Sequence, residues 1–312
     1  MRVNMECQVA IVAIARRENA YINEWIQYHR NIGIGHFYIY DNSFGDEPRI
    51  DEALDNENMR CTTIIPAYDI EYYQRTAYTN AYMKFNSNHQ YLLFIDIDEF
   101  FTLCKHKNMA DYIAFLQDAC PNFQVARVNW EIYDDNDAIE RDMSIPVHQF
   151  FTHPSTTQYS LKCNHSTKSL VKCGLSDISF DDSAHYPTSS SPLLVCDASG
   201  HKIKTKSHFL ENADISMAKI RHYTTKTISE YIDQKLGITN GDRNIADRTI
   251  NNRFFVYCQR TKEKEDYYKM NKPIELNMTL ISIFYDTGIN PLRKHATKQA
   301  ISCWMKQKNL PQ

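Results

Sequence analysis

The sequence predicts an α/β fold in which helices flank a mostly parallel β-sheet. Short apolar runs alternate with segments of helical period between residues 7 and 130, and this alternation is typical of βαβ units. The run Tyr91–Ile95 is apolar throughout and leads directly into Asp96, as expected of a parallel strand that is buried on both faces. A chain of 312 residues, 43% of them hydrophobic, can form one large domain with a C-terminal addition.

The expected strands and helices follow from the spacing of apolar residues. Apolar runs predict strands at residues 7–15, 36–40, 61–65, 91–95 and 123–130. Ile22, Trp25, Ile26 and His29 lie at helical spacing and Gly33 follows them, which predicts a first helix. Further helices are expected at residues 47–58, 72–85 and 109–119. After residue 145 the pattern loosens into strand-like pieces at 148–151, 169–171 and 193–196, and then into helices at 227–236, 243–260 and 291–306.

Charge and cysteine content exclude several classes of protein. The formal net charge is −3 and no long run carries one sign, so nothing indicates nucleic acid as a partner. The nine cysteines form no CxxC pair, which argues against a zinc ribbon or a disulfide framework and favours a reducing compartment. No apolar run has the length of a membrane span or the flanks of a signal peptide. We therefore expect a cytoplasmic protein.

Charged side chains gather where the expected strands end. They are Arg16, Arg17, Glu18, Asp41, Asp96, Asp98, Glu131, Asp134 and Asp135. In open α/β sheets, ligands bind beyond the carboxyl ends of the strands. Asp96 and Asp98 would project to the same side of an extended chain, and two such oxygen ligands suit Mg²⁺ or Mn²⁺ carrying a phosphorylated substrate. Neither a glycine-rich dinucleotide motif nor a Walker A motif is present.

Several segments resemble one enzyme family. They are Val9–Asn19 with Glu24-Trp25 and Tyr28-His29, Tyr40–Ser43, Phe94–Phe100, Asn129–Asn136 and Arg221–Thr227. In this order they resemble glycosyltransferases of the family 2-like and family 92-like group, and in particular its bacterial polysaccharide-type members. Arg17 stands where that group usually has Asn, and Asp134 and Asp137 stand where it usually has Gly.

The resemblance implies a GT-A fold and a metal-dependent, inverting glycosyltransferase. The donor would be a nucleotide sugar, expected to be a UDP-sugar, the cofactor Mn²⁺ or Mg²⁺, and the acceptor a saccharide or a lipid-linked glycan. Residues 1–225 would form the catalytic domain, with the donor half at about 1–100 and the acceptor half at about 101–225. Residues 226–312 would form a helical extension. Such an enzyme would work in the cytoplasm, with possible contact to the inner face of the membrane.

The same resemblance assigns roles to individual residues. Asp96, Asp98 and His222 would hold the metal. Asp135 would be the catalytic base, with Glu131 and Asp134 as alternates, since inversion needs a carboxylate to take the proton of the acceptor hydroxyl. The expected donor-binding residues are Ala15, Arg16, Glu18, Asp41, Gln74, Asp96, Ile97, Lys168 and Lys226. Trp130 and His185 would contact the acceptor.

Two other functions remain open. An aspartate-nucleophile phosphatase also has an Asp-x-Asp pair after a buried strand, but it needs Thr or Val where Phe100 stands here. A non-catalytic module that binds sugars or nucleotides could use the same fold, since a fold does not determine a function.

Overall fold

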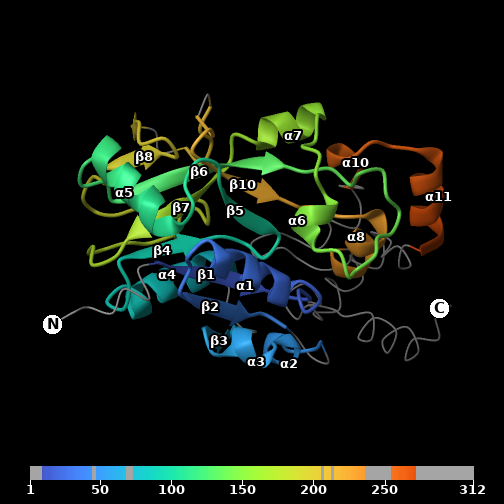
Figure 1. Ribbon diagram of the computed structural model, residues 1–312, viewed down its shortest axis with the longest axis horizontal. Coiled ribbons are helices and arrows are strands. Elements are labelled where there is room, and N and C mark those ends of the chain that lie inside the picture. The colour runs from blue at the N-terminus through green and yellow to red at the C-terminus, as the bar shows by residue number, and fades with distance from the viewer. Residues whose placement is uncertain are drawn as a thin grey trace, which may run out of the picture.

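The computed structural model describes residues 9–43, 47–67, 73–204, 207–211, 214–235 and 254–271. Within these residues ten strands form one sheet in the order β3-β2-β1-β4-β7-β6-β10-β5 (Figure 1), and β8 pairs with β6 while β9 pairs with β8. The strands are β1 Val9–Ala15, β2 His36–Asp41, β3 Thr62–Pro66, β4 Tyr91–Phe94, β5 Glu99–Leu103, β6 Val125–Ile132, β7 Thr167–Lys172, β8 Val195–Asp197, β9 Lys202–Ile203 and β10 Ala218–His222.

The described helices cover both faces of this sheet and one end of the molecule. They are α1 Ile22–Asn31, α2 Ile50–Ala53, α3 Asn56–Met59, α4 Tyr73–Phe85, α5 Met109–Ala119, α6 Val147–Phe150, α7 Gln158–Cys163, α8 Ile228–Gln234, α10 Phe254–Tyr257 and α11 Lys262–Asn271. The predicted α/β class is therefore confirmed. No helix among the described residues is long and apolar enough to cross a membrane.

The sheet is mixed, and the change of strand direction falls in its middle. β1 to β4 pair in parallel, as the alternation of strands and helices predicts. β7 then runs antiparallel to both of its neighbours, β4 and β6. β10 is parallel to β6 and antiparallel to β5. Because β7 is reversed, its amino end meets the carboxyl ends of β4 and β6 at one edge of the sheet.

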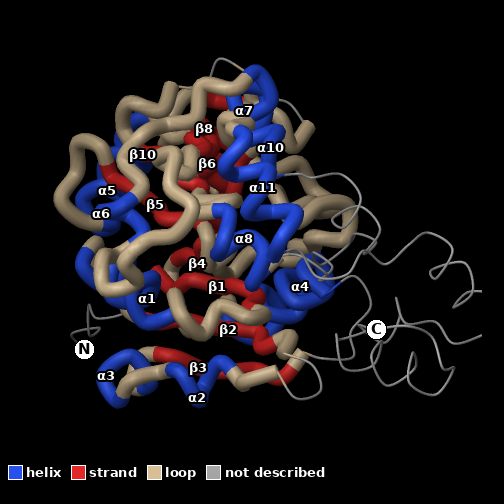
Figure 2. The backbone as a smooth tube through the Cα atoms, turned by 90° about the vertical axis from the view of Figure 1, so that its right-hand side faces the viewer, coloured by secondary structure: helices blue, strands red, loops and turns tan. Residues whose placement is uncertain are grey.

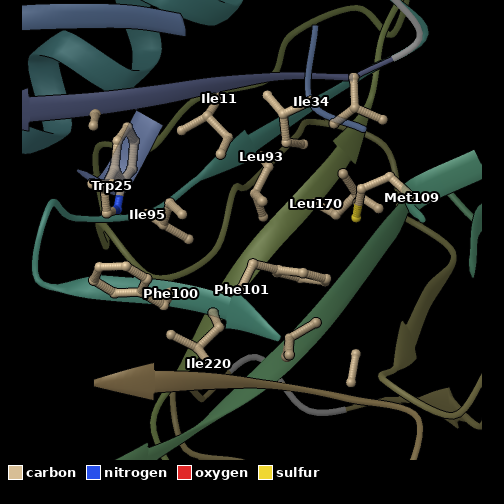
Figure 3. Close-up of a cluster of buried hydrophobic side chains, with 14 of the residues drawn as sticks. Ile11, Trp25, Ile34, Leu93, Ile95, Phe100, Phe101, Met109, Leu170 and Ile220 are labelled. Atoms are coloured by element: carbon tan, nitrogen blue, oxygen red, sulfur yellow. The ribbon is translucent and has the colours of Figure 1, made fainter. Parts of the chain in front are cut away.

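The core lies on both sides of β1. Its residues alternate between the two faces, as successive side chains of a strand must. Ile11 and Ala13 pack with Trp25 of α1 on one face, and Val12 packs with Tyr78 of α4 on the other. Figure 2 shows α1 and α4 on either side of the stacked strands, and Figure 3 shows the side chains of the first face. Burying each large apolar side chain stabilises the fold by about 1.5–3 kcal/mol, so the parallel half is a firm support for the strand ends.

Two predicted elements differ in the structure, and two others lie mostly or wholly outside the described residues. The segment predicted as a strand at 148–151 is mostly helix α6, which follows Pro146 and whose first amide donates to the Glu24 carboxylate over 3.0 Å. The helix predicted at 47–58 is split into α2 and α3, because Leu54 is extended and Asp55 caps the second helix. Most of the helix predicted at 243–260 lies outside the described residues, as does all of the one at 291–306.

Helices α8, α10 and α11 pack together at one end of the molecule (Figures 1 and 2). Thr227 and Glu230 form a capping box at the start of α8, which satisfies amides that the helix would otherwise leave without partners. The Tyr21 hydroxyl donates to the Glu230 carboxylate over 2.8 Å. Tyr21, which directly precedes α1, therefore ties α8 to the parallel half of the sheet.

His29 links α1 to β5 inside the core. Its Nδ1 lies 2.8 Å from the carbonyl of Trp25, and its Nε2 accepts a hydrogen bond from the amide of Phe101 over 3.1 Å. Because Nε2 is the acceptor, the ring is neutral and carries its proton on Nδ1. Burial lowers the pKa of His29 from 6.5 to about 3. Between these two values the unfolded chain binds a proton on His29, whereas the folded chain does not.

The contribution of His29 to stability is present above pH 6.5 and is lost as the pH falls below that value. Between pH 7 and pH 5 the loss amounts to about 2 kcal/mol. In His29→Gln, which keeps one donor and one acceptor but does not titrate, we expect the free energy of unfolding to fall less steeply over this range. Denaturant titrations of both proteins at pH 7, 6 and 5 measure the difference, and parallel curves would contradict the assignment.

Candidate functional site

A cavity of about 570 Å³ lies where several strands of the sheet end. Ala15 at the end of β1, Trp130 near the end of β6 and His222 at the end of β10 contribute to its lining, together with Lys168 near the start of β7. The reversed direction of β7 brings the amino end of that strand to the same edge. The cavity thus occupies the edge at which α/β sheets bind their ligands.

Asp96 and Asp98 line this cavity from a tight turn between β4 and β5. The amide of Glu99 donates to the carbonyl of Asp96 over 3.1 Å, and the amide of Asp96 donates to the Glu99 carboxylate over 3.0 Å. The chain is therefore not extended here, and the expectation that both aspartates project to the same side of a strand does not apply. The two carboxylates lie in different surroundings.

Asp96 is held by residues from the helix and strand beside it. Its Oδ2 accepts a hydrogen bond from the Lys168 ammonium over 2.9 Å, and its Oδ1 accepts from the Tyr78 hydroxyl over 3.0 Å and from the Gln74 amide. Lys168 also lies 3.6 Å from the carboxylate of Glu99. Burial alone would lower the pKa of Lys168, but Asp96 and Glu99 outweigh it and raise this pKa. Lys168 is therefore a fixed positive charge at the floor of the cavity.

Asp98 faces the C-terminal helices. Its Oδ2 accepts a hydrogen bond from the ammonium of Lys235, the residue that follows α8, and its Oδ1 lies 3.5 Å from Nε2 of His222. Burial alone would raise the pKa of Asp98, but Lys235 and His222 outweigh it and hold the pKa well below its usual range. Asp98 is therefore ionised throughout the neutral range of pH.

Asp98 and His222 offer ligands of the right kind for a divalent cation. Neighbouring ligands of one Mg²⁺ lie about 3 Å apart when each bond is about 2.1 Å long, and the 3.5 Å between Asp98 Oδ1 and His222 Nε2 is close to this. His222 Nδ1 is buried without a hydrogen-bond partner among the described residues, so the ring is held by its packing against Trp130. Among the described residues no group of three or more His, Cys, Asp or Glu side chains is arranged to hold a metal ion. Asp98 and His222 therefore fit the role of two protein ligands of a divalent cation, and Asp96 lies close by in the same turn.

A third ion pair lies behind the end of β1. Glu18 is 4.0 Å from the ammonium of Lys226, and Gln234 joins the two by donating to Glu18 over 3.3 Å and accepting from Lys226 over 3.1 Å. Arg17 and Lys226 both have positive φ, at 57° and 55°, a conformation that is uncommon for residues other than glycine. Such local strain is often found at functional sites. Gln234 is adjacent to Lys235, so the same contacts hold Lys235 beside the cavity.

A row of aromatic rings extends from the two aspartates along the cavity. The ring of Trp130 lies 4.4 Å from that of His222 and 5.3 Å from that of His185. His185 in turn lies 5.4 Å from His208, which packs on Phe209. All five side chains line the cavity, and Trp130 Nε1 is buried without a hydrogen-bond partner among the described residues. This half of the cavity combines apolar ring faces with polar edges, as sugar-binding surfaces require.

The structure brings together most of the residues singled out from the sequence. Those that line the cavity are Ala15, Arg16, Glu18, Gln74, Asp96, Ile97, Asp98, Trp130, Lys168, His185 and His222. Asp41 does not line it, because its carboxylate accepts hydrogen bonds from the amides of Ser43 and Ile50. Lys226 lies one layer behind the lining, 4.2 Å from the ring centre of Tyr21.

The three carboxylates expected to supply the base are all absent from the cavity lining. Asp135 is buried and lies 2.7 Å from the ammonium of Lys264 in α11. Glu131 pairs with Lys219 over 2.6 Å, and Asp134 accepts from the amide of Asn136 over 3.0 Å. In this structure the three side chains are therefore held at the end of β6 by contacts outside the cavity lining.

Among the lining residues to which the sequence analysis assigned no role, two are charged side chains at informative positions, Lys235 and Asp182. Lys235 follows a helix, where a basic residue is normally explained by the helix dipole. Asp182 lies in the irregular segment after β7, is exposed, and lines the cavity. No strand or helix pattern predicts the path of that segment, so only the tertiary structure reveals its carboxylate at the site.

Comparisons with known proteins agree on one family. A family model described as Glycosyltransferase family 92 matches residues 12–253. A protein of Ricinus communis described as a glycosyltransferase family 92 protein is 29% identical over 89 residues, which are 28% of this chain and 15% of that protein. A second alignment under the same description is 24% identical over 124 residues, or 39% of this chain and 22% of the relative. The chain therefore aligns with less than a quarter of the length of these relatives.

Because Asp135 and Lys264 form a buried ion pair, we expect removal of the lysine charge to lower the free energy of unfolding. Lys264→Met leaves the Asp135 carboxylate buried without its partner, and we expect a loss of about 3–5 kcal/mol in the free energy of unfolding. Lys269→Met, which removes an exposed lysine from the same helix, should change it by less than about 0.5 kcal/mol. Denaturant titration measures both, and equal effects of the two variants would contradict a structural role for the pair.

Proposed function

The chain belongs to glycosyltransferase family 92, and on this premise we propose that it transfers a sugar from a nucleotide-sugar donor to a saccharide acceptor in the cavity at the end of β1 and β4. The observation that carries the proposal is the turn with Asp96 and Asp98, which faces this cavity together with Lys168, His222 and Lys235. Negative charge develops on the diphosphate as the sugar leaves, and a site with several cations lowers the energy of that state. We propose a GT-A arrangement for this site, in which the first four strands would carry the donor.

The donor half of the site supplies both polar and charged contacts. Arg16 is held by Glu47 through hydrogen bonds of 2.8 and 2.9 Å, so its orientation is fixed beside the end of β1. Lys168 and Lys235 point into the same space and can donate charge-assisted hydrogen bonds to phosphate oxygens. We propose a nucleoside diphosphate sugar as the donor, with UDP as the first nucleotide to test.

We propose that Asp98 and His222, assisted by Asp96, hold Mn²⁺ or Mg²⁺. When bound, such a cation acts as a Lewis acid that neutralises charge on the diphosphate leaving group. The protein positions the ligands for it. His222 is packed against Trp130 at a ring distance of 4.4 Å, and the turn after β4 keeps the carboxylate of Asp98 within 3.5 Å of the imidazole.

Asp182 is the best-placed base for an inverting transfer. Among the described carboxylates that line the cavity, Asp96 and Asp98 are bound to lysines and Glu18 is held by Gln234. Asp182 is exposed in the lining, and no described lysine or arginine forms an ion pair with it. It can therefore accept the proton of an acceptor hydroxyl. Asp135, the base expected from the family pattern, is the second candidate and would have to leave Lys264 first.

The row of rings from Trp130 to Phe209 is the proposed acceptor surface. Ring faces pack against the apolar face of a pyranose, and the polar edges of His185 and His208 are suited to its hydroxyls. The alternative of a non-catalytic binding module shares the cavity but needs no base. The phosphatase alternative finds no support in the family of the chain.

Nucleotide binding is the first test. We expect the wild-type protein to unfold at a higher temperature with UDP and Mn²⁺ together, because a ligand at a hundred times its dissociation constant stabilises by about 2.7 kcal/mol. Asp98→Asn should abolish the shift, whereas Asp142→Asn, at an exposed position, should keep it. UDP, GDP, TDP and ADP are compared at saturating Mn²⁺, and no shift with any of them would contradict the donor site.

The base is tested by two matched substitutions. Asp182→Asn should keep the nucleotide-dependent shift but lower transfer by about 10²–10⁴-fold, because only proton removal is affected. Asp135→Asn should retain transfer while changing stability through Lys264. Release of nucleoside diphosphate with a panel of saccharide acceptors measures both rates. Loss of transfer in Asp135→Asn alone would identify Asp135 as the base, and full donor binding without transfer in the wild type would favour the non-catalytic module.

A further inference from the structure

Each aspartate of the turn after β4 is already bound to a lysine. Lys168 contacts Asp96 over 2.9 Å, and the Lys235 ammonium contacts the carboxylate of Asp98. Beside them Glu18 faces Lys226 over 4.0 Å. The ionised groups at the floor of the cavity are therefore arranged as three ion pairs before any ligand enters.

The two lysines on the aspartates are anchored differently. Lys168 belongs to β7 inside the sheet, its side chain is 1% exposed, and it faces Glu99 as well as Asp96. Moving it would leave the fully buried Glu99 carboxylate and the partly exposed Asp96 carboxylate without this cation, which is costly for the buried one. Lys235 follows the last residue of α8, and its side chain is 12% exposed. Its four-carbon stem can change direction without disturbing the sheet.

A divalent cation and Lys235 compete for the same carboxylate. Asp98 offers Oδ1 beside His222 and Oδ2 to Lys235. A cation bound through Asp98 draws charge from both oxygens and repels the ammonium at close range. A cation that entered alone would thus add positive charge beside aspartates that are already paired with lysines. A cation entering with a diphosphate adds little net charge and gives the displaced ammonium new oxygens to bind.

We propose that Lys235 occupies Asp98 in the empty protein and moves to the diphosphate when nucleotide and cation bind, so that the two ligands bind cooperatively. This inference rests on the metal site proposed above. Lys235 then has two positions, one on the Asp98 carboxylate and one on the leaving group. In the first it keeps isolated cations out of the site, and in the second it adds a charge-assisted hydrogen bond to the developing negative charge.

Cation binding by the protein without nucleotide tests this role directly. Mn²⁺ is titrated into the 312-residue protein, and unbound Mn²⁺ is measured by its electron paramagnetic resonance signal. We expect Lys235→Met to bind Mn²⁺ at least about tenfold more tightly than wild type, because a charge-assisted hydrogen bond no longer competes for Asp98. Lys235→Arg keeps the positive charge and should bind as weakly as wild type. Lys202→Met, at an exposed position on β9, is the matched control.

The same titration with UDP present measures cooperativity. UDP should strengthen Mn²⁺ binding to wild type by a larger factor than to Lys235→Met, since the variant has no ammonium to transfer. The gain in Lys235→Met should vanish in the double variant Lys235→Met/Asp98→Asn. Equal Mn²⁺ affinities of wild type and Lys235→Met, or a gain that persists without Asp98, would overturn the proposal. If none of these proteins binds Mn²⁺, with or without UDP, the proposed metal site is overturned. A thermal shift of the wild type with UDP alone would then indicate that Lys168 and Lys235 bind the diphosphate in place of a metal ion.

Discussion

The site depends on keeping three carboxylates together in one turn, at Asp96, Asp98 and Glu99. Like charges at this separation repel one another, and burial makes the repulsion stronger. Burial raises the pKa of Glu99 well above its usual range, with Lys168 opposing it only in part. Lys168 and Lys235 supply the compensating charge from β7 and from the end of α8. Ion pairs with this turn therefore bring together β7 and the end of α8, which are distant from it in the sequence.

The surrounding fold explains how this concentration of charge is tolerated. Strands β1 and β4 are apolar and buried on both faces between α1 and α4, so the turn that follows β4 begins from a rigid support. The antiparallel strand β7 then passes beside β4 and delivers Lys168 at the level of Asp96. A parallel strand at that position would have presented its amino end at the opposite edge of the sheet. The reversal of β7 is therefore a structural requirement of the site.

The second half of the chain completes the cavity in a different way. Its contacts come from β10, α8 and the irregular segments around His185 and His208. The capping box of α8 and the contact between Tyr21 and Glu230 fix the helix whose end carries Lys235. The side of the cavity at the ends of β1 and β4 is thus built on a packed sheet, and the opposite side is built on hydrogen bonds and ion pairs. This division suits a floor that stays fixed while Lys235 changes partner.

The sequence by itself determined the α/β class, the strands of the parallel half and the place of Asp96 and Asp98 at a strand end, because apolar periodicity is a local property of the chain. Its motifs, which keep their order, also indicated a group of glycosyltransferases that includes the family to which the chain belongs. The tertiary structure alone decided that Asp135 is buried against Lys264, that Asp182 lines the cavity, and that Lys235 reaches Asp98. Those facts depend on the paths of irregular segments and on ion pairs between distant residues, for which the local sequence carries no periodic signal.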